Sequence, residues 1–503
     1  MSEFSLQHLF PGLATEMTVN GAQIDSRKLS EGDVFVAVAS ERMDGFQFAQ
    51  KAQQAGARAI VSNSVEAKTA DLEIPVFYRD ELLDELGYVA ATVNGHPSRQ
   101  LKLVGVTGTN GKTSTCQFVA SIHDQLGQLA TPAYRGGYIG TNGQGLWGDL
   151  VTIENTTPDV FSLNQMLKGQ LDEGAKVTAI EVSSHGIHQQ RIQQLNFDVV
   201  MFTNLSRDHL DYHPTMEAYG QVKKQLFTDY SHKTAVINTD DEFGRTLARE
   251  LLASSASIGQ VLTLSVQDSN ADIYAEGLDL NDQGMNFIWH SPWGVGEISA
   301  QVYGEFNCAN LLAAASACCA TGGRFEDVCG AIENLKPVAG RMEFIPWSTQ
   351  GAGVVVDYSH TPDSLAKALQ ACRHHVNGDL WVVFGCGGDR DPGKRPLMAQ
   401  AAEQFGDRVV VTDDNPRFEE SEAIIAETVK GFKKPERVEA IGDRKAAIEF
   451  ALAHAQPQDL VLIAGKGHED YQEIRGVKHH FSDQEVVRNF GHSPQLETGV
   501  THD

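Results

Sequence analysis

The sequence lacks the features of a secreted, membrane-bound or nucleic-acid-binding protein. Its seven cysteines form no CxxC pair, and an odd, scattered set is typical of reduced thiols in a cytoplasm. No apolar run approaches the ~18 residues of a membrane span, and the N-terminal MSEFSLQHLFPGL has no basic region followed by a long apolar run. Positive charge is scarce, with 40 Lys and Arg against 66 Asp and Glu. We therefore expect a cytoplasmic protein that neither binds nucleic acid nor inserts into a membrane.

The chain is too long for a single hydrophobic core. Its 503 residues exceed the size, roughly 250–300 residues, at which chains divide into domains. A polar segment with Gly and Pro at 94–100 is typical of a linker, and a second break falls near 335–343. We predict three α/β domains: a small N-terminal domain at 1–95, a central parallel-sheet domain at 96–337, and a C-terminal doubly wound, Rossmann-like domain at 338–503.

Short apolar runs alternate with helical patterns along the chain. Runs of this length are typical of parallel strands covered on both faces, and the alternation indicates βαβ units. After the run at 101–107, apolar residues follow helical spacing up to Gly127. The predicted strands lie at 33–38, 57–62, 101–107, 177–183, 197–204, 353–358, 380–385, 408–414 and 460–467.

The stretch VTGTNGKTS, residues 106–114, lies between a predicted strand and a predicted helix. Its glycines would let the backbone approach a phosphate, and a helix N-terminus presents free N–H groups and partial positive charge. Lys112 would reach the outer phosphates of a nucleotide, and the Thr113 hydroxyl would ligate Mg²⁺. The strict motif has a glycine where Val106 stands, so an ordinary glycine-rich turn is the alternative.

Two further strands of the central domain lead into polar groups, Glu181 in AIEVSSHG and His209 in TNLSRDHLD. Ligands of doubly wound sheets bind at the carboxyl ends of the strands, so both side chains could meet Thr113 around Mg²⁺. Burial of an unpaired carboxylate is costly, so we expect Glu181 to have a partner. The alternatives are a structural histidine for His209, and equally for His185, and a solvent-exposed helix lysine for Lys223.

Three loops of the last domain, GCGGDR, DDNPR and GKGHED, follow predicted strands and should meet at one edge of the sheet. Arg390 and Arg417 could each bind a carboxylate through two hydrogen bonds. Asp414 and Glu469 could accept an ammonium group. The alternative for Arg417 is a surface arginine in an Asn-Pro turn.

Ten motifs in a fixed order resemble those of the Mur ligases: TGTNGKTS, ENTTPD, EVSSHG, TNLSRDHLDYH, YGEFNCAN, GRMEF, DYSHTPDSL, FGCGGDRDPGKRP, DDNPR and AGKGHEDYQ. The resemblance extends from about residue 25 to 483, and the phosphate loop of that family needs no glycine at Val106. It implies a first domain for a UDP-linked substrate, a central P-loop ATPase-type domain and a C-terminal domain for an incoming amino acid.

The resemblance also implies ATP and Mg²⁺ as cofactors. Lys223, in K-x-x-L-F, would be carbamylated to N6-carboxylysine and so become an anionic ligand, with the adjacent Lys224 as the alternative. The implied catalytic residues are Lys112, Lys223, Glu181 and His209, and the implied metal ligands are Thr113, Glu181, His209 and Lys223. The implied ATP-binding residues are Gly108, Thr109, Asn110, Gly111, Lys112, Thr113, Ser114, Asn307, Arg341, Asp357 and His360.

The substrates follow from the same resemblance. A UDP-N-acetylmuramoyl dipeptide would contact Ile24, Ser26, Glu41, Arg42, Met43, Asn155, Thr156, Thr157, Ser183, Gln189 and Arg191. Meso-2,6-diaminopimelate would contact Arg390, Asp414, Asn415, Pro416, Arg417, Gly465 and Glu469. A lysine substrate would lack the second carboxylate and leave one arginine unpaired. The implied reaction forms an acyl phosphate on the D-glutamyl γ-carboxylate, which the amine then attacks, and we expect a monomer to perform it.

Two other functions share parts of this pattern. A folylpolyglutamate synthase would share the phosphate loop and the central domain, but DNPR, GKGHED and the first domain argue against it. A nucleotide-dependent switch protein would not explain two arginines on separate strand-end loops. The glycine-rich segment 134–148 has no role that the sequence assigns.

Overall fold

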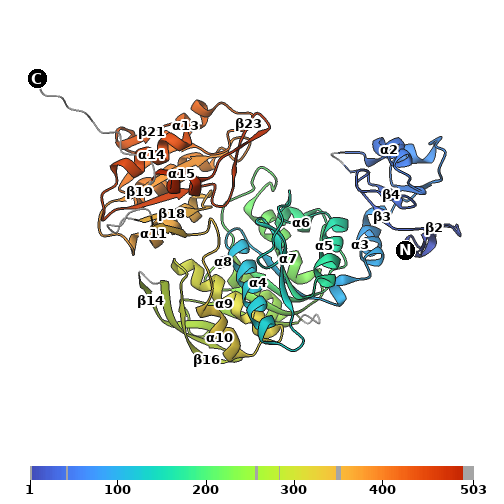
Figure 1. Cartoon of the computed structure of the whole chain (residues 1–503), viewed down its shortest axis with the longest axis horizontal. Helices are drawn as coiled ribbons and strands as arrows, with labels where there is room; N and C mark the ends of the chain where they lie inside the picture. The colour runs from blue at the N-terminus through green and yellow to red at the C-terminus, as the bar shows by residue number, and fades with distance from the viewer. Residues whose placement is uncertain (1–2, 41–42, 255–258, 282–283, 347–352, 491–503) are drawn as a thin grey trace, which may run out of the picture.

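The computed structural model describes residues 3–40, 43–254, 259–281, 284–346 and 353–490, and these contain three larger sheets in succession along the chain, with β1-β2 and β23-β24 as two-stranded sheets. Figure 1 shows the N-terminal part, in blue, and the C-terminal part, in orange and red, on opposite sides of the central part. This three-domain α/β architecture agrees with the fold predicted from sequence. Within the described ranges, no helix is both long and apolar enough to cross a lipid bilayer.

The N-terminal part is built on four parallel strands in the order β3-β4-β5-β6. Its helix α3 (Leu82–Val93) packs against α5 (Val160–Asp172) of the central part, so Val160 and Phe161 belong to the N-terminal core. The elements of this part are β1 (Phe4–Ser5), α1 (Leu6–Leu9), β2 (Thr18–Val19), β3 (Ala22–Gln23), β4 (Val34–Ala37), η1 (Gly45–Phe48), α2 (Ala49–Gln54), β5 (Ala59–Ser62), η2 (Val65–Lys68), β6 (Val76–Tyr78), α3 and η3 (Pro97–Arg99).

The central part contains a ten-stranded sheet in the order β16-β15-β14-β13-β12-β11-β7-β10-β8-β9. Its middle strands are parallel, as expected, whereas β15, β16 and β9 add antiparallel pairs at the two edges. The strands are β7 (Lys102–Thr107), β8 (Arg135–Gly140), β9 (Gly143–Leu146), β10 (Ala175–Glu181), β11 (Phe197–Phe202), β12 (His232–Asn238), β13 (Gln260–Ser265), β14 (Ile273–Asn281), β15 (Gly284–Ser291) and β16 (Gly294–Ala300).

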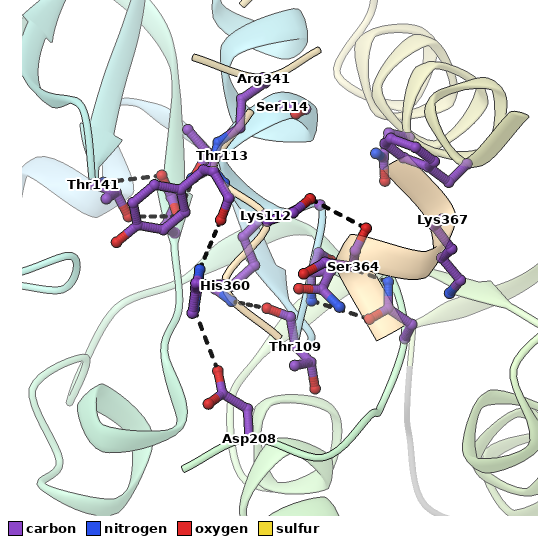
Figure 2. Close-up of a pocket in the computed structure, with 18 of the residues that line it drawn as sticks. Thr109, Lys112, Thr113, Ser114, Thr141, Asp208, Arg341, His360, Ser364 and Lys367 are labelled. Carbon is purple, nitrogen blue, oxygen red and sulfur yellow. Dashed lines mark hydrogen bonds and ion pairs between the residues drawn. The ribbon is translucent and has the colours of Figure 1, made fainter. Parts of the chain in front are cut away.

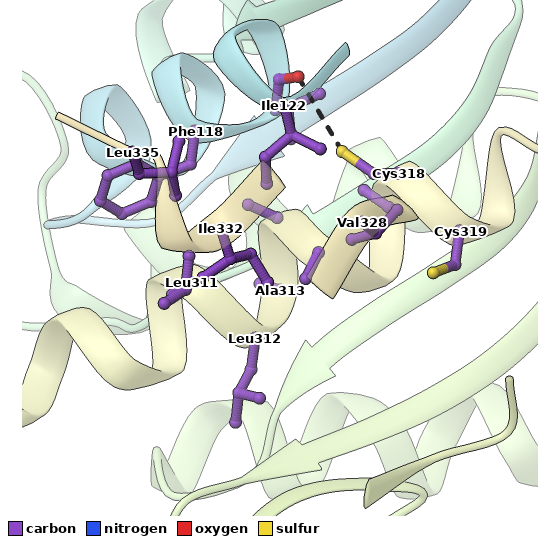
Figure 3. Packing of buried hydrophobic residues seen from close by; sticks show 14 of the residues in the cluster. Phe118, Ile122, Leu311, Leu312, Ala313, Cys318, Cys319, Val328, Ile332 and Leu335 are labelled. Atoms are coloured by element: carbon purple, nitrogen blue, oxygen red, sulfur yellow. Dashed lines mark hydrogen bonds between the residues drawn. The ribbon is translucent and has the colours of Figure 1, made fainter. Parts of the chain in front are cut away.

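Helices cover both faces of this central sheet. On one face, α4 (Lys112–Leu129), α9 (Glu305–Ala320) and α10 (Phe325–Glu333) share a core that includes Phe118, Leu311 and Ile332 (Figure 3). On the other face lie α5, α6 (Ser184–His188), α7 (Met216–Thr228) and α8 (Glu242–Ala253). Burial on both faces explains why the strands read as continuous apolar runs.

The C-terminal part has six strands in the order β17-β18-β22-β19-β20-β21, all parallel except the edge strand β17. Thr361 and Ser364 form a capping box at the start of α11, followed by Pro at its first position. The elements are β17 (Glu343–Pro346), β18 (Gly353–Asp357), α11 (Pro362–Arg373), β19 (Leu380–Cys386), α12 (Lys394–Phe405), β20 (Arg408–Asp413), α13 (Ser421–Val429), η4 (Pro435–Arg437), β21 (Val438–Ala440), α14 (Arg444–His454), β22 (Leu460–Ala464), β23 (Tyr471–Ile474), β24 (Val477–His480) and α15 (Asp483–Phe490).

Candidate active site

The phosphate loop joins β7 to α4, as the sequence predicted. Gly108 has φ 148°, and a Cβ there would lie 1.9 Å from Thr203 Oγ1, so only glycine fits this turn. Lys112 is the first residue of α4, and its ammonium donates to the carbonyl oxygens of Gly108 and Thr109 at 2.8 Å each. Burial lowers the pKa of Lys112. Val106 lies in β7 with its side chain fully buried, so it packs in the sheet core.

Glu181, the last residue of β10, is fully buried and has the partners that its burial demands. Its carboxylate accepts hydrogen bonds from Tyr138 Oη at 2.6 Å and from both the backbone N and the Oγ1 of Thr141, at 3.0 and 3.1 Å. Thr113 Oγ1 donates to the same carboxylate at 3.0 Å. Glu181 therefore connects the phosphate loop to strand β8.

The glycine-rich segment 134–148 forms the hairpin β8–β9 that supplies these partners. A Cβ on Gly136 would lie 2.1 Å from the carbonyl oxygen of Ala120 in α4, and one on Gly140 would lie 2.3 Å from Glu181 Oε1. The glycines thus let the hairpin approach both the helix and the carboxylate. No role for this segment was predicted, and the available signal was its repeated glycines, which indicate close backbone approach.

Lys223 and Lys224 on α7 have different surroundings. Lys223 is 1% exposed, and its ammonium donates to the carbonyl oxygen of Gly108 at 2.8 Å. Burial, followed by the charge of Lys112, holds the pKa of Lys223 well below its ordinary value. Lys224 instead pairs with Glu250 at 2.7 Å near the surface. Of the two lysines, Lys223 is the one that lies at the phosphate loop.

His209 and the phosphate-loop residues line one cavity of the structure. The backbone of His209 is in the left-handed conformation, with φ 54°. Its Nε2 is 3.6 Å from Asp208 Oδ2, and its ring meets that of His185 edge to face at 5.0 Å between centroids. Burial lowers the pKa of His209 to about 3, with Asp208 acting in the opposite direction. The imidazole is therefore neutral near pH 7 and can act as a ligand.

The expected metal ligands fit Mg²⁺ only in part. In the described portion of the chain, no three His, Cys, Asp or Glu side chains are close enough to hold an ion by themselves. Thr113 and Glu181 nevertheless present two oxygens within hydrogen-bonding distance of each other at the phosphate loop. Mg²⁺ typically takes one or two protein oxygens and completes its shell with water and substrate phosphates. The donor set therefore suits a metal that arrives with a nucleotide.

A cavity of about 790 Å³ lies between the central and C-terminal parts and is lined by both. Arg341 donates to Thr113 Oγ1 at 3.0 Å and stacks on the Tyr358 ring, while His360 Nε2 lies 3.6 Å from Asp208 Oδ2 (Figure 2). Burial would raise the pKa of Asp208, but His360 and His209 outweigh it and lower that pKa. The expected nucleotide residues that line the cavity are Thr109, Asn110, Gly111, Lys112, Thr113, Ser114, Arg341, Asp357 and His360.

Not every expected nucleotide or dipeptide residue lines this cavity. Asn307 is buried, and its side chain accepts from Asn310, which does line the cavity. Gln189 lies outside the lining and accepts from Arg191 Nη2 at 2.6 Å, which orients that guanidinium. The expected dipeptide residues that line the cavity are Asn155, Thr156, Thr157, Ser183 and Arg191.

The residues expected at the uridine end lie apart from this cavity, in the N-terminal part. Ile24 and Ser26 are half-buried beside β3, and Met43 is exposed. Glu41 and Arg42 lie outside the described residues. Lys28 Nζ donates to Ser162 Oγ at 3.0 Å. Ser162 belongs to α5, so this hydrogen bond links the N-terminal part to the central part.

A second polar cluster forms where β20 and β22 end, as the strand-edge rule predicted. Asn415 Nδ2 donates to Glu469 Oε2 at 2.9 Å. Arg417 has φ 53°, donates to the carbonyl oxygen of Gly388 at 2.8 Å and pairs with Glu473 at 3.3 Å. Arg390 lies on the loop after β19 and lines the large cavity. Tyr358, which also lines this cavity, donates to Glu469 Oε1 at 3.4 Å, so the polar cluster adjoins the cavity through Tyr358.

Sequence reasoning missed the buried charges that support this cluster. Arg444 and Asp483 form an ion pair at 2.8 Å with both side chains fully buried. Arg444 also donates to the carbonyl oxygens of Asp413 and Ala464, the last residues of β20 and β22. Lys466 is fully buried within GKGHED. The available signal for Lys466 was the GKGHED motif itself, because a charged residue in a glycine-flanked turn after a strand needs a partner.

Family models match the chain in three consecutive segments. Residues 18–97 match the model described as Mur ligase family, catalytic domain, residues 106–318 match the Mur ligase middle domain, and residues 340–467 match the Mur ligase, glutamate ligase domain. The three matches fall on the three sheets described above.

Curated relatives extend over nearly the whole chain. The UDP-N-acetylmuramoyl-L-alanyl-D-glutamate–2,6-diaminopimelate ligase of Pseudomonas aeruginosa is 44% identical over 482 residues, covering 96% of each chain. Its namesake from Haemophilus influenzae is 42% identical over 485 residues, covering 95% of this chain and 98% of the relative.

Solved structures agree with these relatives. A structure titled as UDP-N-acetylmuramoyl-L-alanyl-D-glutamate–2,6-diaminopimelate ligase superposes with a TM-score of 0.68 at 34% identity, covering 98% of this chain and 99% of that one. A folylpolyglutamate synthase of Mycobacterium tuberculosis, complexed with ADP and AMPPCP, has a TM-score of 0.62 at 20% identity and covers 77% of this chain, which is a likeness of fold alone. From its domain order, its phosphate loop and these relatives, the chain belongs to the Mur ligase family.

Proposed function

We propose that the chain is the ATP-dependent ligase that joins meso-2,6-diaminopimelate to the D-glutamyl γ-carboxylate of UDP-N-acetylmuramoyl-L-alanyl-D-glutamate in peptidoglycan precursor synthesis. The observation that carries the proposal is that the phosphate-loop cavity, which Arg390 and Tyr358 line, adjoins the cluster of Asn415, Arg417 and Glu469 through the hydrogen bond from Tyr358 to Glu469. A two-substrate ligation needs such adjacent sites, and relatives more than 40% identical carry this activity in their names.

Positive charge around the phosphate loop supports a phosphoryl transfer step. The γ-carboxylate attacks the γ-phosphate of ATP, which gives ADP and an acyl phosphate. Lys112 belongs to the phosphate loop and Arg341 reaches Thr113 from the C-terminal part, so both can neutralise charge that develops on the transferred phosphate. Mg²⁺ bound with ATP at Thr113 and Glu181 would supply further charge neutralisation. The amine of diaminopimelate then attacks the acyl carbon and phosphate leaves.

An acyl phosphate hydrolyses readily, so the site must exclude water during the reaction. Contacts between the central and C-terminal parts already surround the cavity. Arg207 pairs with Asp391 at 3.1 Å, and Asn110 Nδ2 donates to Asp363 at 3.3 Å. We propose that the C-terminal domain closes further on the substrates through this interface.

Carbamylation of Lys223 belongs to the same proposal. Its amine is buried beside the phosphate loop, and within the described residues it makes no ion pair. Reaction with CO₂ would form a carbamate and release a proton, and the anionic oxygens would then lie beside the Lys112 ammonium, which contacts the same Gly108 carbonyl oxygen. His209 also lines the cavity, and we propose that it would help to hold a second Mg²⁺ ion.

The uridine end of the substrate is assigned to the N-terminal domain, at Ile24, Ser26 and the turn 41–43. The dipeptide is assigned to Asn155, Thr157 and Arg191, which line the cavity on the central-domain side. A monomer in the cytoplasm remains our expectation, and the seven cysteines of the structure are all unpaired, which is typical of a reducing compartment.

The decisive experiment is phosphate release by the purified protein with a panel of amino acids. Release should require ATP, the UDP-muramoyl dipeptide and diaminopimelate together. Equal turnover with lysine would contradict the proposed specificity, and steady hydrolysis of ATP without the other substrates would favour a nucleotide switch.

A further inference from the structure

Lys466 is a buried cation at the centre of the second polar cluster. It lies in the loop that follows β22, and its side chain has no exposed surface. Its ammonium lies 3.0 Å from Asn415 Oδ1, 3.2 Å from Glu469 Oε2 and 3.5 Å from Asp414 Oδ1. One lysine thus contacts three residues that are assigned to the incoming amino acid.

The ammonium of Lys466 determines how the Asn415 amide is oriented. Asn415 Oδ1 accepts from Lys466 and also from the backbone N of Glu473 at 2.8 Å. The Nδ2 group must therefore point the other way, where it donates to Glu469 Oε2. Without the ammonium, one of the two donors that fix this orientation is lost.

Lys466 also sets the charge of the cluster. Asp414 and Glu469 are two carboxylates with little exposed surface, and Lys466 is the cation that both share. Burial works to raise the pKa of Asp414, but Lys466 and then Arg444 outweigh it and lower that pKa. Two close carboxylates with no cation between them would instead tend to share a proton. Arg417 also lowers the pKa of Asp414, but it ranks after Lys466 and Arg444 among the causes, and its guanidinium pairs with Glu473.

We propose that Lys466 is a positioning and specificity-determining residue of the amino-acid subsite. Its ammonium balances one of the two carboxylates, Asp414 and Glu469. The negative charge that remains matches one substrate ammonium, and Arg417 stays available to bind the neighbouring substrate carboxylate. Removal of Lys466 makes the subsite more negative. The subsite then repels the substrate carboxylate and favours a substrate such as lysine, whose distal end carries an ammonium group without a carboxylate. This inference rests on the proposed function, in which the substrate carries both groups at its distal end.

The test compares Lys466→Met with Lys478→Met in the full-length protein. Lys478 is the matched control, because it is exposed and also lies over the Tyr471 ring, at 4.1 Å against 5.6 Å for Lys466. For Lys466→Met, we expect the KM for diaminopimelate to rise about 10- to 100-fold. The ratio of kcat/KM for diaminopimelate to kcat/KM for lysine should fall, while the KM for ATP stays unchanged.

A second variant covers the case in which Lys466→Met does not fold. Lys466→Gln keeps a donor for Asn415 but removes the charge, so it should lower the same specificity ratio. An unchanged ratio in a folded variant, or a parallel change in the KM of every substrate, would overturn the inference. If the wild-type protein does not prefer diaminopimelate, the proposed function fails first and this inference fails with it.

Discussion

The side-chain nitrogen of Lys223 donates to the carbonyl oxygen of Gly108 at 2.8 Å, so α7 is tied to the first glycine of the phosphate loop. The adjacent Lys224 faces the surface and pairs with Glu250. These adjacent lysines make a matched pair for mutation, because one contacts the phosphate loop and the other does not.

Lys223→Ala should lower kcat by about 100-fold or more, because it removes a group at the site of charge development. Short carboxylates such as acetate should restore part of the activity if the missing group is a carbamate. Lys224→Ala should leave kcat unchanged. The steady-state rate with and without acetate tests both points, and full activity of Lys223→Ala would exclude the carbamate.

Arg341 of the C-terminal part contacts the phosphate loop through a 3.0 Å hydrogen bond to Thr113 Oγ1. Arg341→Lys removes the planar fork and its stacking on Tyr358. We expect kcat to fall by about 100-fold, with little change in the thermal midpoint. Arg373→Lys, on the surface beside Asp407, is the control. A loss confined to the KM for diaminopimelate would contradict a role at the phosphate.

Arg417 should determine the preference for diaminopimelate over lysine. Arg417→Ala removes the guanidinium that would bind the second carboxylate, so the KM for diaminopimelate should rise by about 10- to 100-fold. The same variant should use lysine no worse than the wild-type protein does. Arg475→Ala, an exposed arginine in the turn between β23 and β24, is the control. Equal losses with both amino acids would instead indicate a structural arginine.

The sequence predicted the strands that carry the site because buried parallel strands leave a strong apolar signal. The run at 197–204 became β11 (Phe197–Phe202), and Glu181 ends β10 as expected. The partners of Glu181 were not predictable, because Tyr138 and Thr141 come from a glycine-rich hairpin whose position depends on tertiary packing. Local patterns report which residues are buried but not which distant residues they meet.

The antiparallel edges of the central sheet were missed for a related reason. In β15 and β16 buried residues alternate with more exposed ones, and in β14 only Ile273 is buried, so none of the three shows the continuous apolar run that predicts a buried strand. The buried pair Arg444 and Asp483 is separated by 39 positions in the sequence, so spacing gave no indication of it. Assignment of individual residues to substrates came from the motif resemblance, and it stays a prediction in all three domains.

His123 should make the central domain sensitive to acid. Its Nε2 lies 2.8 Å from Thr321 Oγ1, and burial, aided by Lys102 and Lys176, lowers its pKa to about 3. Since the unfolded histidine binds its proton near pH 6.5, stability is fully present above that pH and is lost as the pH falls towards 3. The loss is at most about 1.4 kcal/mol per pH unit. Phe118 and Ile122 of the same helix share this core.

His123→Gln should flatten this acid dependence. We would compare the urea midpoint of unfolding at pH 7.5 and pH 5 for the variant and for the wild-type protein. The variant should lose less stability between the two pH values, even if it is less stable at both. His454→Gln, at an exposed position, is the control. The same acid loss in wild-type protein and His123→Gln would show that other groups cause it.

The buried pair of Arg444 and Asp483 should matter for both stability and substrate binding, and the two effects can be separated. Asp483→Asn leaves a buried guanidinium without its carboxylate, so the C-terminal domain should lose about 3–5 kcal/mol of unfolding free energy. The double variant Arg444→Met and Asp483→Leu should recover most of that loss, because apolar side chains can replace a buried ion pair. It should still bind diaminopimelate weakly, since nothing then holds the carbonyl oxygens of Asp413 and Ala464 at the base of the two substrate loops. Recovery of both stability and KM in the double variant would show that the pair does not position the subsite.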